Sequence, residues 1–173
     1  QDPLQTLDLY TVKPDFSAAP VVFFVHGGGW HTGDKTMNLE KGQNYAREGI
    51  LFVNVNYRLA PKNKHPEQIE DIAKAFAWTK ANAKKYGGDP ERIFVMGHSA
   101  GAHLVDLLAT NDKYLQEVGL TLADIKGVVS LDTASVNLLS VQGGEGVESQ
   151  LVGPMITQAF GKDKKTLEEA SPT

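Results

Sequence analysis

The sequence contains no cysteine among its 173 residues. The chain can therefore form no disulfide, no thiolate metal site and no cysteine nucleophile. Because exported bacterial proteins can also lack cysteine, this absence leaves the cellular compartment open.

The chain also lacks an excess of basic residues and any long apolar run. Lys and Arg together number 17 against 21 Asp and Glu, which gives a formal net charge of -4. No basic cluster is present to bind phosphates, so we expect no nucleic-acid partner. No apolar run approaches the ~20 residues needed to cross a bilayer, so we expect no membrane span. No residue pattern indicates a metal or a cofactor.

What the sequence has instead is an alternation of strand and helix patterns without internal repeats. The predicted strands lie near residues 7–12, 21–25, 51–56, 93–96 and 127–131. The predicted helices cover residues 35–48, which Asp34 could cap, residues 66–86, and a solvated segment at 161–170. This order predicts one α/β domain over residues 1–173, with a mostly parallel sheet flanked by helices on both faces.

The most informative stretch is an apolar β run that leads into Gly97-His98-Ser99-Ala100-Gly101, called here the serine turn, and then into a helical pattern. This arrangement is typical of a nucleophile elbow, in which a tight turn holds a serine hydroxyl clear of the backbone. The residues two before and two after the serine must lack a Cβ that would collide, and both are glycine. The following helix directs free N–H groups toward any negative charge that forms beside the hydroxyl.

A second motif, His26-Gly27-Gly28-Gly29-Trp30, follows another predicted buried strand and is called here the glycine loop. Consecutive glycines at a strand end expose backbone N–H groups. Aimed at one point, such groups form an oxyanion hole for acyl transfer. The alternative is a glycine-rich turn with no chemistry.

With the segment Asn56-Tyr-Arg-Leu-Ala-Pro61, these two motifs make the chain resemble the α/β-hydrolase superfamily. The resemblance is to carboxylesterases related to hormone-sensitive lipase and to their neighbours, the kynurenine-formamidase-like enzymes. It implies an α/β-hydrolase fold with Ser99 as the nucleophile. It also implies that the backbone N–H groups of Gly28, Gly29 and Ala100 are the oxyanion donors.

The same resemblance implies a triad acid and a triad histidine on loops after the last two core strands. The predicted strands correspond to the family's core only up to its sixth strand, so we expect the fold to be incomplete at its C-terminal end. Residues 1–173 alone would then be nearly inactive. The strand at 127–131 would be an open edge that self-associates or pairs with a complementary C-terminal segment.

No triad histidine is identified among the five histidines. His26 belongs to the glycine loop and His98 to the serine turn, while His103 is expected to pack or hydrogen-bond beneath the glycine loop. We expect His31 at the mouth of the cleft and His65 exposed at the entry to a helix.

Asp132, which follows the strand at 127–131, is a candidate triad acid. A cap of the turn after that strand is the alternative for this residue, and an acid further downstream is another.

Residues 136–160 are apolar and broken by glycine. In relatives, insertions at this point form a cap over the acyl pocket, and ordinary connecting helices are the alternative.

Taken together, these features predict a serine hydrolase that cleaves carboxylic esters of small or short-chain acyl groups through an acyl-enzyme intermediate, without a cofactor. Two alternatives remain open: an N-formyl or aryl-amide hydrolase, and a non-catalytic binding module with the hydrolase fold. Binding alone would not require Ser99 and three glycines in one loop.

Overall fold

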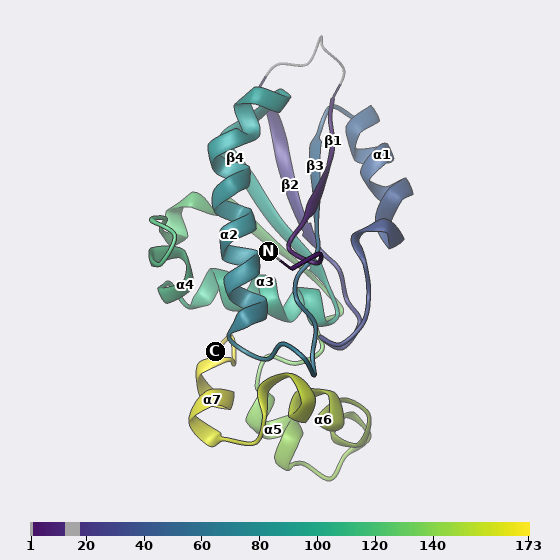
Figure 1. The fold of residues 1–173 in the computed structure, drawn as a ribbon, viewed down its shortest axis with the longest axis vertical. Coiled ribbons are helices and arrows are strands. Elements are labelled where there is room, and N and C mark those ends of the chain that lie inside the picture. The colour runs from purple at the N-terminus through teal and green to yellow at the C-terminus, as the bar shows by residue number, and fades with distance from the viewer. Residues whose placement is uncertain (1, 13–17) are drawn as a thin grey trace.

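The computed structural model describes residues 2–12 and 18–173. In these residues a five-stranded sheet has the order β1-β3-β2-β4-β5 (Figure 1). The strands are β1 (Leu7–Tyr10), β2 (Ala19–Val25), β3 (Leu51–Val55), β4 (Gly88–His98) and β5 (Gly127–Leu131). Strands β2 to β5 are parallel, and β1 runs antiparallel to β3. The predicted mostly parallel sheet is confirmed.

The two central strands, β2 and β3, are almost entirely buried on both faces. Their β-branched and aromatic side chains suit a pleated surface that is covered on both sides. Strand β4 begins earlier than predicted, at Gly88 rather than near residue 93. Gly88 pairs with Ala19 across an irregular register, while Glu91 and Arg92 are exposed, so local composition does not reveal this part of the strand.

Helices cover both faces of the sheet (Figure 1). Helix α1 (Leu39–Arg47) contacts β1 and β3, and α2 (Glu67–Asn82) and α3 (Ala100–Thr110) pack on the opposite face. The 3-10 turn η1 (Lys35–Asn38) precedes α1, and its first N–H groups are capped by Asp34, which accepts from the Thr36 amide. Asp34 is thus confirmed as a cap.

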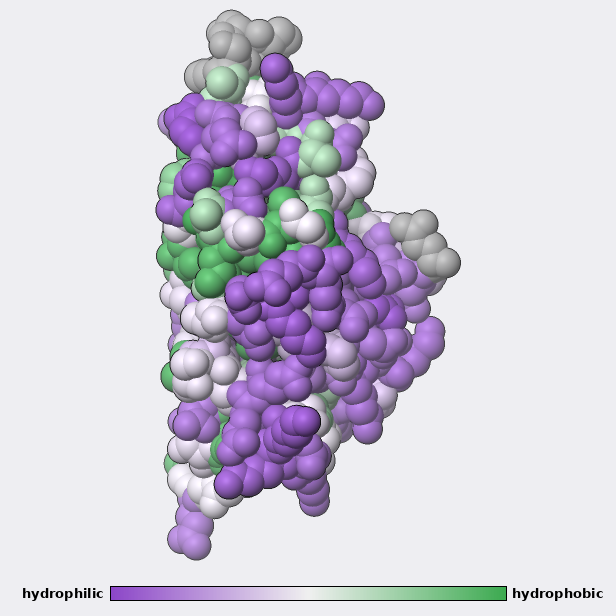
Figure 2. Space-filling view, turned by 90° about the vertical axis from the view of Figure 1, so that its left-hand side faces the viewer, coloured by the Kyte–Doolittle hydropathy of each residue, from purple (hydrophilic) through white to green (hydrophobic). Residues whose placement is uncertain are grey.

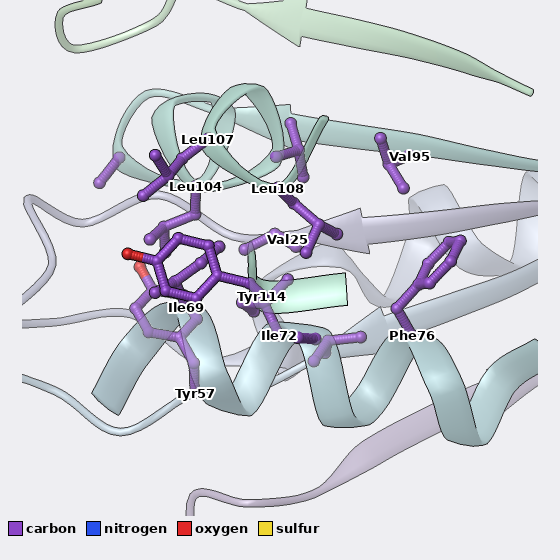
Figure 3. Packing of buried hydrophobic residues seen from close by; sticks show 14 of the residues in the cluster. Val25, Tyr57, Ile69, Ile72, Phe76, Val95, Leu104, Leu107, Leu108 and Tyr114 are labelled. Carbon is purple, nitrogen blue, oxygen red and sulfur yellow. The ribbon is translucent and has the colours of Figure 1, made fainter. Parts of the chain in front are cut away.

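The main core lies between the sheet and helices α2 and α3 (Figure 3). Ile69, Ile72 and Phe76 recur at helical spacing on α2 and face the leucines of α3. Phe76 meets Phe23 of β2 edge to face, with 5.6 Å between ring centroids. This packing sets the distance of α3 from the sheet, and therefore the position of the serine turn relative to the strand ends.

Short helical segments complete the order of elements. They are η2 (Ala83–Tyr86), α4 (Lys113–Gln116), η3 (Leu122–Asp124), α5 (Leu138–Gly143), α6 (Val147–Phe160) and α7 (Lys164–Glu169). Helices α5, α6 and α7 gather beyond one end of the sheet (Figure 1). No helix in the described ranges is long and apolar enough to cross a membrane.

The helix predicted within residues 161–170 is present as α7, and most of its charged side chains are exposed, but its inner side is not solvated. Leu167 and Ala170 are fully buried in the main core. The charged residues of this segment occupy only its outer side, and Lys113 forms an ion pair with Glu169 there. The packed side depends on contacts with distant residues, which the local pattern does not contain.

Strand β5 is the outermost strand on its side of the described sheet and pairs only with β4. Its apolar side chains reach the surface: Val128, Val129 and Leu131 are 41%, 39% and 36% exposed. A hydrophobic band is visible among hydrophilic side chains in the space-filling view (Figure 2).

Candidate active site

The serine turn joins the end of β4 to the start of α3, and Ser99 lies at its apex. Ser99 has φ 52° and ψ −120°, a strained conformation for a residue with a side chain. Three backbone hydrogen bonds hold it there: its N–H donates to Leu131 O at 2.9 Å, and its carbonyl accepts from His103 N at 3.1 Å and from Ala134 N at 3.4 Å. The predicted strand–serine–helix turn is therefore present.

Close backbone packing explains the two glycines of the turn. A Cβ on Gly97 would lie 2.2 Å from the carbonyl oxygen of Gly101. A Cβ on Gly101 would lie 2.2 Å from Val25 O and 2.5 Å from His26 O. Real Cβ atoms do not approach oxygen this closely, so both positions require glycine for the reason predicted from the sequence.

The glycine loop lies directly against the serine turn. A Cβ on Gly27 would lie 3.1 Å from the Cβ of Ser99. The loop then continues through positive φ angles of 120° at Gly28, 59° at Gly29 and 62° at Trp30. Among the described residues, the backbone N–H groups of Gly28, Gly29 and Ala100 have no hydrogen-bond acceptor, whereas the Gly28 carbonyl accepts from two amides of its own loop.

His26 supports the glycine loop from below. Its ring is stacked on Tyr57, with 4.6 Å between centroids, and its Nδ1 lies 2.7 Å from Gly27 O. Since a carbonyl oxygen only accepts, Nδ1 carries the proton. Burial lowers the pKa of His26, so the ring is neutral at pH 7. The Tyr57 hydroxyl also donates to His26 O at 3.2 Å.

Asn56 and Asp34 connect the segment that follows the glycine loop to the end of β3. The Asn56 Nδ2 donates to Asp34 Oδ2 at 2.7 Å, and its Oδ1 accepts from Lys35 N at 2.6 Å. Hydrogen bonds from Thr36 and Asn56 lower the pKa of Asp34 to about 2. The sequence alone indicates no role for Asn56 and Tyr57 within residues 56–61, because their hydrogen-bond partners lie more than twenty residues away along the chain.

His103 lies beneath the glycine loop, as predicted. Its side chain is completely buried, its Nδ1 accepts from Trp30 Nε1 at 3.3 Å, and its Nε2 donates to Ala170 O at 2.9 Å. The prediction that His65 is exposed is wrong. His65 is half-buried, with its ring against Phe160 and its Nε2 3.3 Å from the Tyr114 hydroxyl, because α6 covers the start of α2.

The other two histidines lie on the loops of the site itself. His31 is half-buried and its Nδ1 lies 3.0 Å from Gly29 O, whereas His98 is exposed beside Gly27. Within residues 2–12 and 18–173, no side chain hydrogen-bonds to the Ser99 hydroxyl. The structure thus places all five histidines, and in its described residues none of them hydrogen-bonds to that hydroxyl.

Asp132 immediately follows Leu131, whose carbonyl accepts the Ser99 N–H. Its φ is 51° and its side chain is exposed. The carboxylate forms no hydrogen bond with any described residue, so the turn-capping alternative is wrong. A free carboxylate thus lies on the segment next to the serine turn.

A cavity of about 700 Å³ opens beside the glycine loop on the side of α1. His26, Gly28, Asp34 and His98 are among its lining residues. On the other side, the Met155 sulfur of α6 lies 2.6 Å from where a Cβ on Gly29 would be. In the described ranges, no group of three His, Cys, Asp or Glu side chains is arranged to hold a metal ion.

Burial of His103 predicts a pH dependence of stability. Burial lowers the pKa of this imidazole to about 4, from 6.5 when unperturbed. Below pH 6.5 the His103 imidazole binds a proton in the unfolded chain but not in the folded chain. The free energy of unfolding therefore falls as the pH drops toward 4. We expect a loss of about 3 kcal/mol from this group, and no change from it above neutrality.

Urea denaturation in steps between pH 7 and pH 4 measures this loss. His103→Asn removes the titrating imidazole, and its stability should vary less with pH over the same window. His65, whose pKa burial also lowers to about 4, remains in both proteins and cancels in the comparison. Equal pH dependence in the two proteins would contradict the prediction.

The BD-FAE family model matches residues 7–173. The chain is 40% identical over 116 residues to a probable carboxylic ester hydrolase, LipM, of Mycobacterium tuberculosis, which covers 64% of this chain and 27% of that protein. It is 37% identical over 133 residues to the versiconal hemiacetal acetate esterase of Dothistroma septosporum, covering 75% of this chain and 39% of that protein.

Solved structures show the same architecture. A hyperthermophilic esterase from Pyrobaculum calidifontis superposes with a TM-score of 0.75 at 28% identity, covering 99% of this chain and 62% of that one. Esterase B from Lactobacillus rhamnosis, at 24% identity and a TM-score of 0.76, shows the fold alone and covers 57% of that chain. The chain thus spans well under half of the length of the two sequence relatives. It belongs to the BD-FAE family and has an α/β-hydrolase fold of the carboxylesterase type.

Proposed function

We propose that the protein is a serine hydrolase that cleaves carboxylic esters. The observation that carries this proposal is the meeting of the serine turn and the glycine loop. Among the described residues the Ser99 hydroxyl and the N–H groups of Gly28, Gly29 and Ala100 have no hydrogen-bond partner, and the glycine loop lies against Ser99 at Gly27. If these N–H groups point toward the hydroxyl, the arrangement suits attack on an acyl carbon.

In the proposed reaction, the Ser99 oxygen attacks the ester carbonyl carbon as a base removes the hydroxyl proton. The carbonyl oxygen becomes an oxyanion that accepts hydrogen bonds from the three backbone N–H groups. Collapse of this intermediate breaks the bond to the alcohol, which leaves with the proton, and forms an acyl-enzyme. Water attacks the acyl-enzyme in the same way, releasing the acid and restoring Ser99.

The base of this reaction is proposed to be a histidine outside residues 1–173. His26, His65 and His103 are turned to other partners within the fold. Asp132 is retained as a candidate triad acid, because its free carboxylate follows the residue bonded to Ser99. If the base lies elsewhere, residues 1–173 alone should be nearly inactive.

The substrate is proposed to be an ester of a small or short-chain acyl group. Two relatives named as esterases support the reaction class, and one of them is named for an acetate ester. Helices α5 and α6 are proposed to form a cap over the acyl group, because Met155 of α6 contacts the glycine loop. A cap this close to the glycine loop leaves little room for the acyl group and so favours substrates with short acyl chains.

A substrate panel on the full-length protein tests the proposal. We expect kcat/KM for p-nitrophenyl acetate and butyrate to exceed that for the palmitate ester by about tenfold or more, because a long chain cannot be accommodated beneath the cap. N-formylkynurenine and an acetanilide serve as amide substrates in the same panel. Faster turnover of either amide than of every ester would overturn ester cleavage in favour of the amide-hydrolase alternative.

A further inference from the structure

One residue, His103, is hydrogen-bonded to both halves of the proposed site, through its backbone to the serine turn and through its imidazole to the glycine loop. It lies one helical turn after Ser99, and its backbone N–H donates to Ser99 O at 3.1 Å. Its imidazole Nδ1 accepts from the indole Nε1 of Trp30, the last residue of the glycine loop, at 3.3 Å. The same residue therefore ties the serine turn to the loop that carries the N–H donors.

The surroundings of His103 fix where its proton lies. Its Nε2 is 2.9 Å from Ala170 O, and since a carbonyl only accepts, Nε2 carries the hydrogen. Nδ1 is left with a lone pair, and an indole N–H can only donate to it. Complete burial lowers the pKa of the ring to about 4, so this tautomer persists through the neutral range.

Trp30 needs such a restraint because its backbone is strained. Its φ of 62° is unfavourable for a bulky residue, and it follows two glycines with positive φ. The indole is fully buried, with the rings of His103 and Phe160 at 5.2 Å and 5.1 Å between centroids. The Trp30 carbonyl accepts from Ala60 N at 2.9 Å. A strained residue persists only where its surroundings over-determine its conformation.

We propose that Trp30 and His103 are positioning residues that keep the N–H groups of the glycine loop directed at the oxyanion that forms beside Ser99. This inference rests on the proposed ester hydrolysis. The peptide planes of Gly28 and Gly29 lead directly into Trp30, so a change at its backbone turns those planes. A misplacement of about 1 Å in such donors is enough to slow an acyl transfer strongly.

Kinetics of single variants of the full-length protein test the proposal. Trp30→Phe removes the indole N–H donor together with part of the buried indole, and keeps one aromatic ring. We expect kcat to fall about 10- to 100-fold with KM within about twofold, because the loop's donors act on the transition state. His103→Leu should likewise lower kcat and leave KM nearly unchanged. The double variant should have a kcat no lower than that of the less active single variant.

His103→Asn is the rescue variant, since its Oδ1 stands near the position of Nδ1 and can accept from Trp30. We expect its kcat to lie within about fivefold of wild type. Trp78→Phe is the matched control, because Trp78 is 39% exposed and packs against Tyr86 away from the site. It should leave kcat unchanged. A Trp30→Phe protein that is folded and keeps wild-type kcat would overturn the proposal.

Hydrogen exchange provides a readout that does not need activity. In wild type the Trp30 indole N–H should exchange far more slowly than that of Trp78. His103→Leu should accelerate it about tenfold or more, together with the amides of His31 and Thr32, which donate to Gly28 O. If wild type neither hydrolyses esters nor reacts with a fluorophosphonate, the proposed function fails, and this exchange result alone decides whether the Trp30–His103 bond holds the loop. Unchanged exchange in His103→Leu would refute it.

Discussion

Replacing Ser99 with alanine in the full-length protein is expected to lower kcat for ester hydrolysis by about 10⁶-fold and to abolish fluorophosphonate labelling. Loss of the nucleophile in a serine hydrolase has an effect of this order, because only the oxyanion donors and substrate binding remain. The hydroxyl forms no hydrogen bond with the described residues, so its removal should leave the melting temperature nearly unchanged. Steady-state kinetics, gel-based labelling and calorimetry measure the three quantities.

Ser140→Ala is the matched control for this experiment. Ser140 is exposed on α5, and its replacement should alter neither labelling nor kcat. A clean Ser99→Ala preparation that still turned over esters would remove Ser99 from the mechanism, and with it the proposed acyl-enzyme.

Adding one methyl group at Gly101 is expected to have the largest effect on stability. In Gly101→Ala the new Cβ would meet Val25 O at 2.2 Å and His26 O at 2.5 Å. Both oxygens belong to the backbone at the end of β2, so the clash can be relieved only by moving α3 away from the sheet. We expect the free energy of unfolding to fall by about 3 kcal/mol or more, with loss of activity in the folded fraction.

Gly143→Ala provides the comparison, because no atom lies within 4 Å of the position of its Cβ. This variant should be neutral or slightly stabilising, since alanine favours the helix more than glycine does. Urea denaturation of the two variants beside wild type measures the difference. Similar stabilities would mean that the close packing at Gly101 can relax at little cost.

The parts of the fold that the sequence predicts are those whose causes are local. Gly97 and Gly101 stand at a fixed spacing from Ser99, and Asp34 caps a turn two residues away. The apolar strands and the helix over α2 also follow from short-range patterns. Each of these features can be predicted from a short stretch of consecutive residues.

The predictions that were wrong depend on distant partners. His65 looks like an exposed helix entry until α6 covers it, and Ala170 belongs to a charged segment until His103, 67 residues earlier, donates to its carbonyl. The start of β4 has a polar composition that does not indicate a strand, and its Gly88 pairs with Ala19, which lies far earlier in the chain. No local window contains these contacts.

The backbone conformation at Ser99 also restricts which amino acids evolution can place at this position. At φ 52° a second heavy atom on Cβ would crowd the preceding peptide, so threonine, valine and isoleucine are disfavoured there. Among the aliphatic hydroxyl and thiol side chains, serine and cysteine are the two with an unbranched Cβ. A lineage that kept this turn and a hydroxyl or thiol nucleophile would therefore have one exchange open to it at this position, from oxygen to sulfur.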